Sequence, residues 1–255
     1  MAFNLMNRIH WLDPLDPDQP FPPVSRALRD PDGLLAAGGD LCIPRLLRAY
    51  RIGVFPWYEA GQPILWWSPD PRTILYPEDL YLSRSLRKAL RNRPYTVTFD
   101  TRFGEVMRAC AAPRPDQHGT WITPEMIEAY CALHDAGHAH SVEVTDGIGR
   151  LVGGLYGVAI GHVFFGESMF SRVRDGSKIA LVWLACHLQH WGYRLIDCQQ
   201  ATPHMLRMGA HGIPRETFSA LLDEHCPRPG HPSPWQTDPD LDVANWQPGP
   251  HGPCP

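Results

Sequence analysis

Proline is distributed so unevenly along this chain that it limits where a regular fold can form. Of its 27 prolines, six lie in the first 31 residues and nine in the last 29. Repeated proline removes backbone donors and interrupts both helices and central strands. Residues 227–255 are therefore predicted to be a disordered tail outside the fold, and the ordered elements are expected before it.

The middle of the chain mixes helical and strand patterns without a regular strand–helix repeat. Helices are predicted from apolar spacing and end signals, and strands from alternation and turn signals. The expected helices are 43–51, 83–92, 123–136, 177–191 and 214–222, and the expected strands are 64–67, 95–99, 141–145, 150–156, 161–165 and 194–198. Helices interleaved with hairpins indicate an α+β fold.

Composition places the chain among ordinary globular proteins. Hydrophobic residues at 44% and charged residues at 20% exclude wholesale disorder. The longest apolar run, residues 179–186, is far shorter than the ~20 residues of a membrane span, and the opening residues have no secretion signal. Seven scattered cysteines favour a reduced, cytoplasmic setting. A net charge of −4 argues against a protein that coats nucleic acid indiscriminately.

Two polar residues occur close together at the end of a predicted buried strand. Period-two alternation puts Asp197 and Gln199 on one face of this strand and Cys198 on the other. A carboxylate beside an amide can orient or deprotonate an amine. Alternatively, Asp197 caps the neighbouring loop and Gln199 meets solvent. The catalytic reading predicts that Asp197→Ala stops the reaction and leaves the fold nearly intact.

Glu167 is the one acid in the aromatic run 164–170, FFGESMF. A buried charge is costly unless it is paired. Glu167 is therefore expected either to bind a cation or to form half of a structural salt bridge.

Three histidines, His134, His138 and His140, have a spacing seen in metal sites. The second adjoins the glycine that should end the helix, and polar residues are favoured at helix C-termini in any case. No metal site is expected here.

A stripe of cations is predicted on one face of helix 83–92. Arg84, Arg87, Lys88 and Arg91 recur at helical spacing, with leucines on the other side. Such a face is often merely solvated. A stripe of one sign without a carboxylate also suits a phosphate backbone.

Motifs in unbroken order from about residue 8 to 222 resemble the leucyl/phenylalanyl-tRNA–protein transferase family. They are GVFPWY (53–58), ILWWSPDPR (64–72), SRSLRK (83–88), GTWIT (119–123), HAHSVEV (138–144), LVGGLYG (151–157), FFGESMFS (164–171) and LIDCQ (195–199), followed by His204. The resemblance implies a small N-terminal α/β domain over residues 1–73 and an acetyltransferase-like (GNAT-like) catalytic domain over residues 74–226, with the tail from 227 to 255 outside both.

The resemblance also implies an activity. Members of the family transfer Leu or Phe from aminoacyl-tRNA to the α-amino group of proteins that begin with Arg or Lys, which marks those proteins for degradation in an N-degron pathway. Neither a metal nor another cofactor is expected, and the chain is expected to act as a cytoplasmic monomer without contact to a membrane.

Roles for individual residues follow from the same resemblance. Asp197 and Gln199 would be the catalytic pair, with Asp197 either polarising Gln199 or acting on the amine itself. Glu167 would hold the cationic acceptor, and Trp57 and Trp121 would contact the 3′-terminal adenosine of the tRNA. The pocket for the transferred side chain would consist of Leu155, Phe164, Met169, Leu181, Leu188 and Ile196. Leucine at positions 155, 184 and 188 departs from familiar members, so the preference between Leu and Phe stays open.

Two other functions fit parts of the pattern. A small-molecule N-acetyltransferase of the same fold would need a glycine-rich loop for a pyrophosphate, and residues 171–176 lack the Arg/Gln-x-x-Gly-x-Gly pattern. A non-enzymatic tRNA-binding module would explain the cationic stripe but would leave Glu167 and Asp197 without a role.

Overall fold

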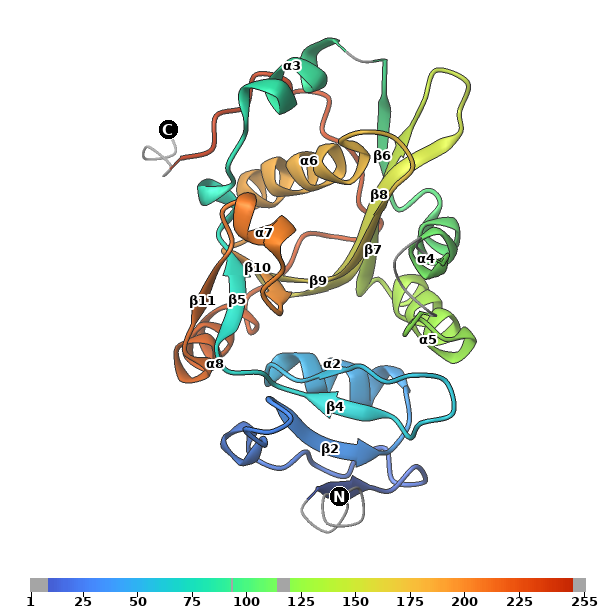
Figure 1. Cartoon of the computed structure of the whole chain (residues 1–255), viewed down its shortest axis with the longest axis vertical. Helices are drawn as coiled ribbons and strands as arrows, with labels where there is room; N and C mark the ends of the chain where they lie inside the picture. Colours follow the sequence, from blue (N-terminus) through green and yellow to red (C-terminus); the bar gives the residue numbers. More distant parts are fainter. Residues whose placement is uncertain (1–8, 93, 114–119, 250–255) are drawn as a thin grey trace.

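Two mixed sheets organise the computed structural model, which describes residues 9–92, 94–113 and 120–249. The small sheet has the strand order β1 (His10–Leu12), β2 (Leu34–Gly38), β4 (Leu65–Trp67) and β3 (Phe55–Pro56). Helix α2 (Ile43–Arg51) lies between this sheet and the rest of the molecule (Figure 1). The prolines before β2 lie in loops and turns, and Pro23 directly precedes the short 3-10 helix η1 (Val24–Arg26).

The large sheet has seven strands. Their order is β11 (His211–Ile213), β5 (Arg72–Leu75), β10 (Leu195–Gln199), β9 (Val163–Ser171), β8 (Leu151–Ile160), β7 (Ala139–Thr145) and β6 (Thr96–Phe99). All neighbours are antiparallel except β9 and β10, which are parallel. The change from the small sheet to the large one falls at residues 68–71, close to the expected domain boundary at residue 73.

Helices cover both faces of the large sheet (Figure 1). The remaining helices are η2 (Pro77–Asp79), α3 (Arg84–Asn92), α4 (Phe103–Ala111), α5 (Pro124–Asp135), α6 (Gly176–His190), α7 (Pro203–Arg207) and α8 (Arg215–His225). Helix α6 packs on one face, and α4 and α5 pack on the other. Within the described residues, no helix has both the length and the apolar character needed to cross a bilayer.

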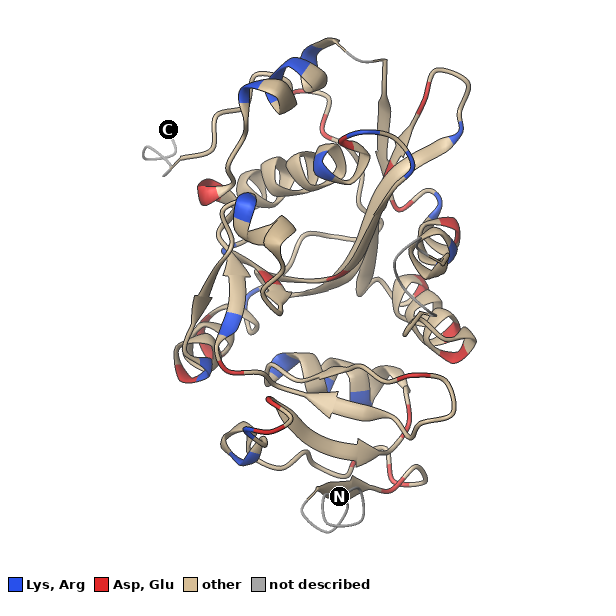
Figure 2. Ribbon diagram, viewed as in Figure 1, with Lys and Arg blue, Asp and Glu red and all other residues tan. Residues whose placement is uncertain are grey.

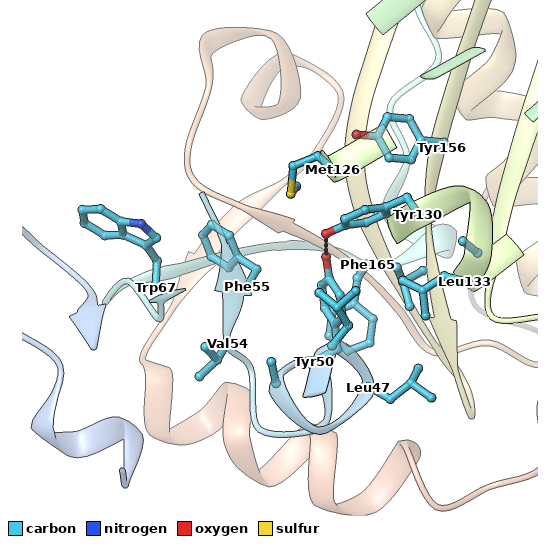
Figure 3. Packing of buried hydrophobic residues seen from close by; sticks show 14 of the residues in the cluster. Leu47, Tyr50, Val54, Phe55, Trp67, Met126, Tyr130, Leu133, Tyr156 and Phe165 are labelled. Carbon is cyan, nitrogen blue, oxygen red and sulfur yellow. Dashed lines mark hydrogen bonds between the residues drawn. The ribbon is translucent and has the colours of Figure 1, made fainter. Parts of the chain in front are cut away.

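Strand alternation sends neighbouring side chains into two separate cores. Leu155 and Phe164 join the core under α6. Tyr156 and Phe165 point to the other face, where they join the core formed with α2, α4 and α5 (Figure 3). The second core also includes Tyr50 of α2, so the small N-terminal part and the large sheet share one hydrophobic cluster.

The expected mixture of helices and strands is confirmed, and most of the predicted elements are present. Thr123 caps α5 as its sequence position indicated, because its side chain accepts a hydrogen bond from the Met126 N–H. Strand β9 is longer than predicted and continues to Ser171. The elements that were not predicted are helices α4 and α7, the 3-10 helices η1 and η2, and strands β1, β2, β3, β5 and β11. Strand β5 has four residues, all buried, so it shows no alternation.

The proline-rich C-terminal segment is not a disordered tail. Residues 227–249 lie along the large sheet and α6 and end beside α3 (Figure 1). Trp235 is only 1% exposed; its backbone N–H donates to Asp100 Oδ2 over 2.7 Å, and its ring stacks on His140. Proline prevents regular structure in this segment, but Trp235 and Val243 still anchor it by hydrophobic burial. Residues 250–255 lie outside the described part of the chain.

Candidate active site

The parallel strands β9 and β10 separate at their C-terminal ends and border a cavity there. They pair only from Val163–Leu195 to Phe165–Asp197. Beyond that pair lies a cavity of about 900 Å³, lined by residues 166–171 of β9 and residues 197–198 of β10. A separation of parallel strands exposes backbone and side chains from both of them, which makes it a suitable place for a ligand.

A β-bulge positions Glu167 at this opening. On β8, Tyr156 pairs with Ser168 and the next residue, Gly157, pairs with Gly166, so Glu167 is the extra residue on β9. Only glycine fits at position 157, because a Cβ there would collide with the carbonyl oxygen of Phe165. The bulge therefore depends on a specific residue of the neighbouring strand.

Neutral donors hold the carboxylate of Glu167. Its Oε1 accepts hydrogen bonds from the hydroxyl of Tyr50 (2.7 Å) and from Nε2 of Gln199 (2.8 Å), and its Oε2 accepts one from the hydroxyl of Tyr130 (3.2 Å). The two tyrosine hydroxyls also lie within hydrogen-bonding distance of each other, so their two protons are shared among three contacts (Figure 3). The contacts seen within the described residues are thus not those of a structural salt bridge.

Glu167 changes between its protonated and ionised forms near neutral pH. Burial raises the pKa of Glu167 to about 7, against the hydrogen bonds from Tyr50 and Tyr130, which favour the carboxylate. The negative charge of Asp197 raises it further. A cation that entered the site would favour the ionised form and gain a partner that is already hydrogen-bonded in place.

Asp197 lies in a fully buried ion pair that sequence reasoning did not find. Its two carboxylate oxygens accept from Nε and Nη2 of Arg72 over 2.8 and 2.6 Å, and both side chains are 0% exposed. Arg72 also donates to the Gly53 carbonyl (3.0 Å) and lies between the rings of Phe55 and Phe218. It thereby connects β10 to the N-terminal part of the chain and to α8.

Gln199 reaches Glu167 through an irregular end of β10. The pairing of β10 with β5 shifts between Asp197 and Gln199, and Gln199 has a left-handed backbone with φ of +61°. Asp197 Oδ1 accepts the backbone N–H of Gln199 over 2.9 Å and stabilises this turn. The predicted pair is therefore linked through the backbone, whereas the two side chains bond to different partners, Arg72 and Glu167.

The cavity contains five of the six residues expected in the side-chain pocket, together with one that was not assigned to it. Leu155, Phe164, Met169, Leu181 and Ile196 line it. Leu188 is not among the residues that line this cavity; it packs in the core one helical turn beyond Leu184 on α6. Leu184 lines the cavity in its place.

A second cavity, of about 1010 Å³, adjoins the first. Trp57 and Trp121 line it together with Gln199, and the two cavities share Trp121, Glu167 and Cys198 in their walls. Trp57 is 39% exposed and packs edge-on against Trp67, whose indole N–H donates to the Trp57 carbonyl. The two predicted adenosine-binding rings thus lie in the wall of one cavity, and Glu167 lies where it meets the other.

The cationic stripe lies elsewhere. Figure 2 shows it along α3, at the opposite end of the molecule from the small sheet. Arg84, Lys88 and Arg91 are exposed. Arg87 is half-buried and donates to the Trp246 carbonyl over 3.3 Å, so it partly serves to hold the C-terminal segment.

Cys198 and the histidines have structural contacts. Burial raises the pKa of the Cys198 thiol well above its usual range, which keeps it protonated. His140 bonds to Asp100, and His134 bonds to the Ala139 carbonyl. Over the described ranges, no group of three or more His, Cys, Asp and Glu side chains is placed to hold a metal ion.

Comparison with known proteins identifies the family. The family model for leucyl/phenylalanyl-tRNA protein transferase matches residues 74–223, and that for the N-terminal domain of the same transferase matches residues 39–70. The chain belongs to the leucyl/phenylalanyl-tRNA–protein transferase family. The matched ranges of the transferase models include the residues of both cavities, while Arg72 falls in the short gap between them.

Relatives that carry this transferase name are similar over most of their length. The one from Alkalilimnicola ehrlichii is 54% identical over 93% of this chain and 92% of its own. Those from Nitrosomonas europaea and Pseudomonas syringae are each 59% identical, over 87% and 83% of this chain and 93% and 91% of their own.

Proposed function

We propose that this chain transfers Leu or Phe from aminoacyl-tRNA to the α-amino group of proteins that begin with Arg or Lys, which marks those proteins for degradation. The observation that carries the proposal is the position of Glu167. It lies where an apolar cavity suited to a Leu or Phe side chain meets a cavity walled by two tryptophans. A cationic acceptor held there would have its amine beside both parts of the donor.

The donor would be bound in two places. Its aminoacyl side chain would occupy the first cavity, where burial of apolar surface favours Leu and Phe. Its terminal adenosine would stack on Trp57 and Trp121 in the second cavity, because base–aromatic stacking is a common mode of binding for single-stranded ends. The phosphates of the tRNA would contact Arg84, Lys88 and Arg91, with Arg87 as a weaker contributor.

Gln199 is proposed to orient the attacking amine. Since its Nε2 donates to Glu167, its amide oxygen remains to accept a hydrogen bond from the amine. Both oxygens of Asp197 already accept from Arg72. Of the two roles considered for Asp197, polarising and positioning Gln199 is therefore favoured over direct action on the amine.

The reaction itself requires mainly alignment. The ester that joins the amino acid to the tRNA is already activated, so holding an amine against its carbonyl supplies much of the rate. The amine nitrogen forms a bond to the carbonyl carbon, the ester bond to the ribose oxygen breaks, and the proton lost by the amine ends on that oxygen. Since only aminoacyl-tRNA and an acceptor protein are needed, we propose that the reaction uses no cofactor. We also propose that the chain acts in the cytoplasm as a monomer.

We further propose an acetyltransferase-like fold for residues 74–226, beside a small domain over residues 1–73. The support is the large mixed sheet, whose single parallel pair, β9 and β10, separates at the proposed donor site. The small sheet with α2 supports a separate N-terminal unit.

A transfer assay tests the function. The purified chain is mixed with tRNA carrying labelled Leu or Phe and with acceptor proteins that begin with Arg, Lys or Ala. Label should appear on the Arg- and Lys-initiated acceptors alone. Acetyl transfer from acetyl-CoA without aminoacyl transfer would favour the acetyltransferase alternative, and tRNA binding without either transfer would favour a binding module.

A further inference from the structure

The hydroxyl of Tyr156 is buried without a hydrogen-bond partner. The side chain is 0% exposed, and its oxygen has no donor or acceptor among the described residues. Buried hydroxyls in folded proteins nearly always have a partner, because an unpaired one lowers stability. Because Tyr156 is also one of the residues that line the candidate active site, its unpaired hydroxyl points to a group that arrives with the substrate.

The position of Tyr156 relates it to Glu167. It stands on β8 directly opposite Ser168, next to the bulge that presents Glu167. Its ring packs edge-on against that of Tyr130, whose hydroxyl donates to Glu167. In Figure 3 the hydroxyl groups of Tyr156 and Tyr130 point in the same direction. Tyr156 also lines the 900 Å³ cavity.

The neighbouring hydroxyls are already committed. Tyr50 and Tyr130 donate to Glu167, and so does the amide nitrogen of Gln199. Tyr156 keeps its own proton, because burial and then the charge of Glu167 raise its pKa well above 10. It is therefore a neutral donor that lies beside the proposed reaction centre and has nothing to donate to.

Among the described residues that line this cavity, one other has a buried polar atom without a partner: His204 on α7, at its Nε2. The charges that act on His204 are those of Lys178 and Arg207, whereas the charge with the largest effect on Tyr156 is that of Glu167. The relation to Glu167 therefore distinguishes Tyr156 from His204.

We propose that Tyr156 is a further catalytic residue, whose hydroxyl donates a hydrogen bond to the carbonyl oxygen of the aminoacyl ester. As the amine adds to the carbonyl carbon, the π electrons move to this oxygen, and the hydroxyl stabilises the resulting negative charge. When the intermediate collapses, the electrons return, the ribose oxygen leaves and takes up the proton lost by the amine, and Tyr156 retains its own. The inference rests on the proposed function.

Tyr156→Phe tests this role, because it removes only the oxygen. Loss of an oxyanion donor lowers kcat by about 10²- to 10³-fold. We expect kcat to fall at least about 10²-fold. The Kd for an unreactive, amide-linked aminoacyl-tRNA analogue should stay within about twofold. The Tm should not fall, because the hydroxyl that is removed had no partner in the folded protein.

Tyr193→Phe is the matched control. Tyr193 is also buried, but its hydroxyl accepts the backbone N–H of His231 and lies outside both cavities. This variant should transfer at the wild-type rate. Wild-type chain that transfers nothing would refute the proposed function itself. Wild-type transfer together with an equally active Tyr156→Phe, or a Tyr156→Phe variant whose Tm falls as its activity does, would overturn this inference alone.

Discussion

Arg72 and Asp197 form a two-point ion pair that is completely buried, with Nε–Oδ1 and Nη2–Oδ2 distances of 2.8 and 2.6 Å. The pair joins residues 125 positions apart in the sequence, and it leaves Asp197 one further bond, to the backbone N–H of Gln199. Asp197 is therefore held too tightly to serve as a free base. Its loss would also leave an unpaired charge on Arg72 in the core.

Asp197→Ala should lower the free energy of unfolding by about 3–5 kcal/mol, the usual result when one partner of a buried pair is removed. This prediction differs from the expectation from the sequence that the fold would survive the change, because that expectation did not include the pair with Arg72. Arg72→Lys keeps the charge but loses the two-point contact, so it should cost about 1.5–3 kcal/mol. Urea denaturation measures both. Arg150→Ala breaks the surface pair with Asp146 and should cost no more than about 1 kcal/mol.

Glu167→Gln should weaken an Arg-initiated acceptor at least about tenfold, since a charge-assisted contact is worth about 1.5–3 kcal/mol. It should also change the pH profile. The pKa of Glu167 is raised to about 7, so the carboxylate that binds the acceptor is lost as pH falls through 7, and wild-type kcat/KM should fall there too. In the variant the decrease in kcat/KM near pH 7 should disappear. The decrease near pH 8, which arises from protonation of the acceptor amine, should remain. Unchanged acceptor affinity would assign Glu167 a structural role.

The same pKa shift predicts a stability effect. Because the pKa of Glu167 is higher in the folded chain than its ordinary value of 4.5, the folded state binds more protons between pH 4.5 and about 7. The contribution of Glu167 to stability is thus fully present below about pH 4.5 and is lost as pH rises through 7. Chemical denaturation of both chains across this range should show that the wild type loses stability relative to Glu167→Gln as the pH rises, because this difference isolates Glu167 from groups such as His187 that titrate in the same range.

Leu184 and Leu188 should behave differently although they lie one turn apart on α6. Leu184→Phe fills part of the first cavity and should reduce transfer of Phe relative to Leu. Leu188→Ala should lower stability by about 2–5 kcal/mol through the void it leaves without changing the Phe-to-Leu ratio. A competition assay with the two charged tRNAs measures that ratio. A shifted ratio in Leu188→Ala at wild-type stability would return Leu188 to the pocket.

Local patterns in the sequence were sufficient for the elements with strong end signals. Thr123 and the glycine after α5 mark that helix, and Asp146-Gly147 marks the turn between β7 and β8. The same kind of reasoning showed that Glu167 needs a partner. It did not show which one, because Tyr50 is 117 residues away and sits in an amphipathic helix where any tyrosine looks like a core residue.

Long-range pairing also explains the other failures. Arg72 is the last residue of the motif ILWWSPDPR (64–72), but nothing near it in the sequence shows that its partner is Asp197. The bulge at Glu167 and the left-handed backbone of Gln199 arise from strand pairing, which alternation does not report. Proline density correctly excluded helices and strands over residues 227–249, the described part of this segment, yet the burial of Trp235 shows that irregular chain can still pack.

The exposed cations of α3 should contribute to tRNA binding through counterion release. Each lost phosphate contact reduces the slope of log affinity against log salt by about 0.7–0.9. Arg84→Ala combined with Lys88→Ala should therefore lower the magnitude of this slope by up to about two, with little change in stability. Arg26→Ala combined with Arg29→Ala, on the exposed surface of the N-terminal part, is the control. An unaltered salt titration would leave the α3 stripe as solvated surface.

The C-terminal segment should make the fold sensitive to acid through His187. Its Nδ1–H donates to the Trp183 carbonyl over 2.8 Å, and its Nε2 accepts the backbone N–H of Asp238 over 3.0 Å. Protonation of Nε2 would place two donors against each other and break this contact. Burial lowers the pKa of His187, partly offset by the bond to Trp183 and the charge of Asp238. The unfolded chain therefore binds the proton first as pH falls.

The consequence is a loss of stability on the acid side. Above about pH 6.5, His187 is neutral in both states and its contribution to stability is fully present; as pH falls from there towards the lowered folded pKa, this contribution is progressively lost because the unfolded chain is protonated first. One such group contributes a slope of at most about 1.4 kcal/mol per pH unit.

Denaturation of His187→Gln at pH 8 and pH 5.5 measures this effect. At pH 8 the variant should be less stable than the wild type, because two hydrogen bonds to the histidine are lost. Between pH 8 and pH 5.5 its stability should drop less than that of the wild type. His10→Gln, on the exposed edge strand β1, should retain the wild-type drop. If His187→Gln loses as much stability on acidification as the wild type, the acid sensitivity arises elsewhere, and the C-terminal segment is held by Trp235 and its hydrophobic neighbours instead.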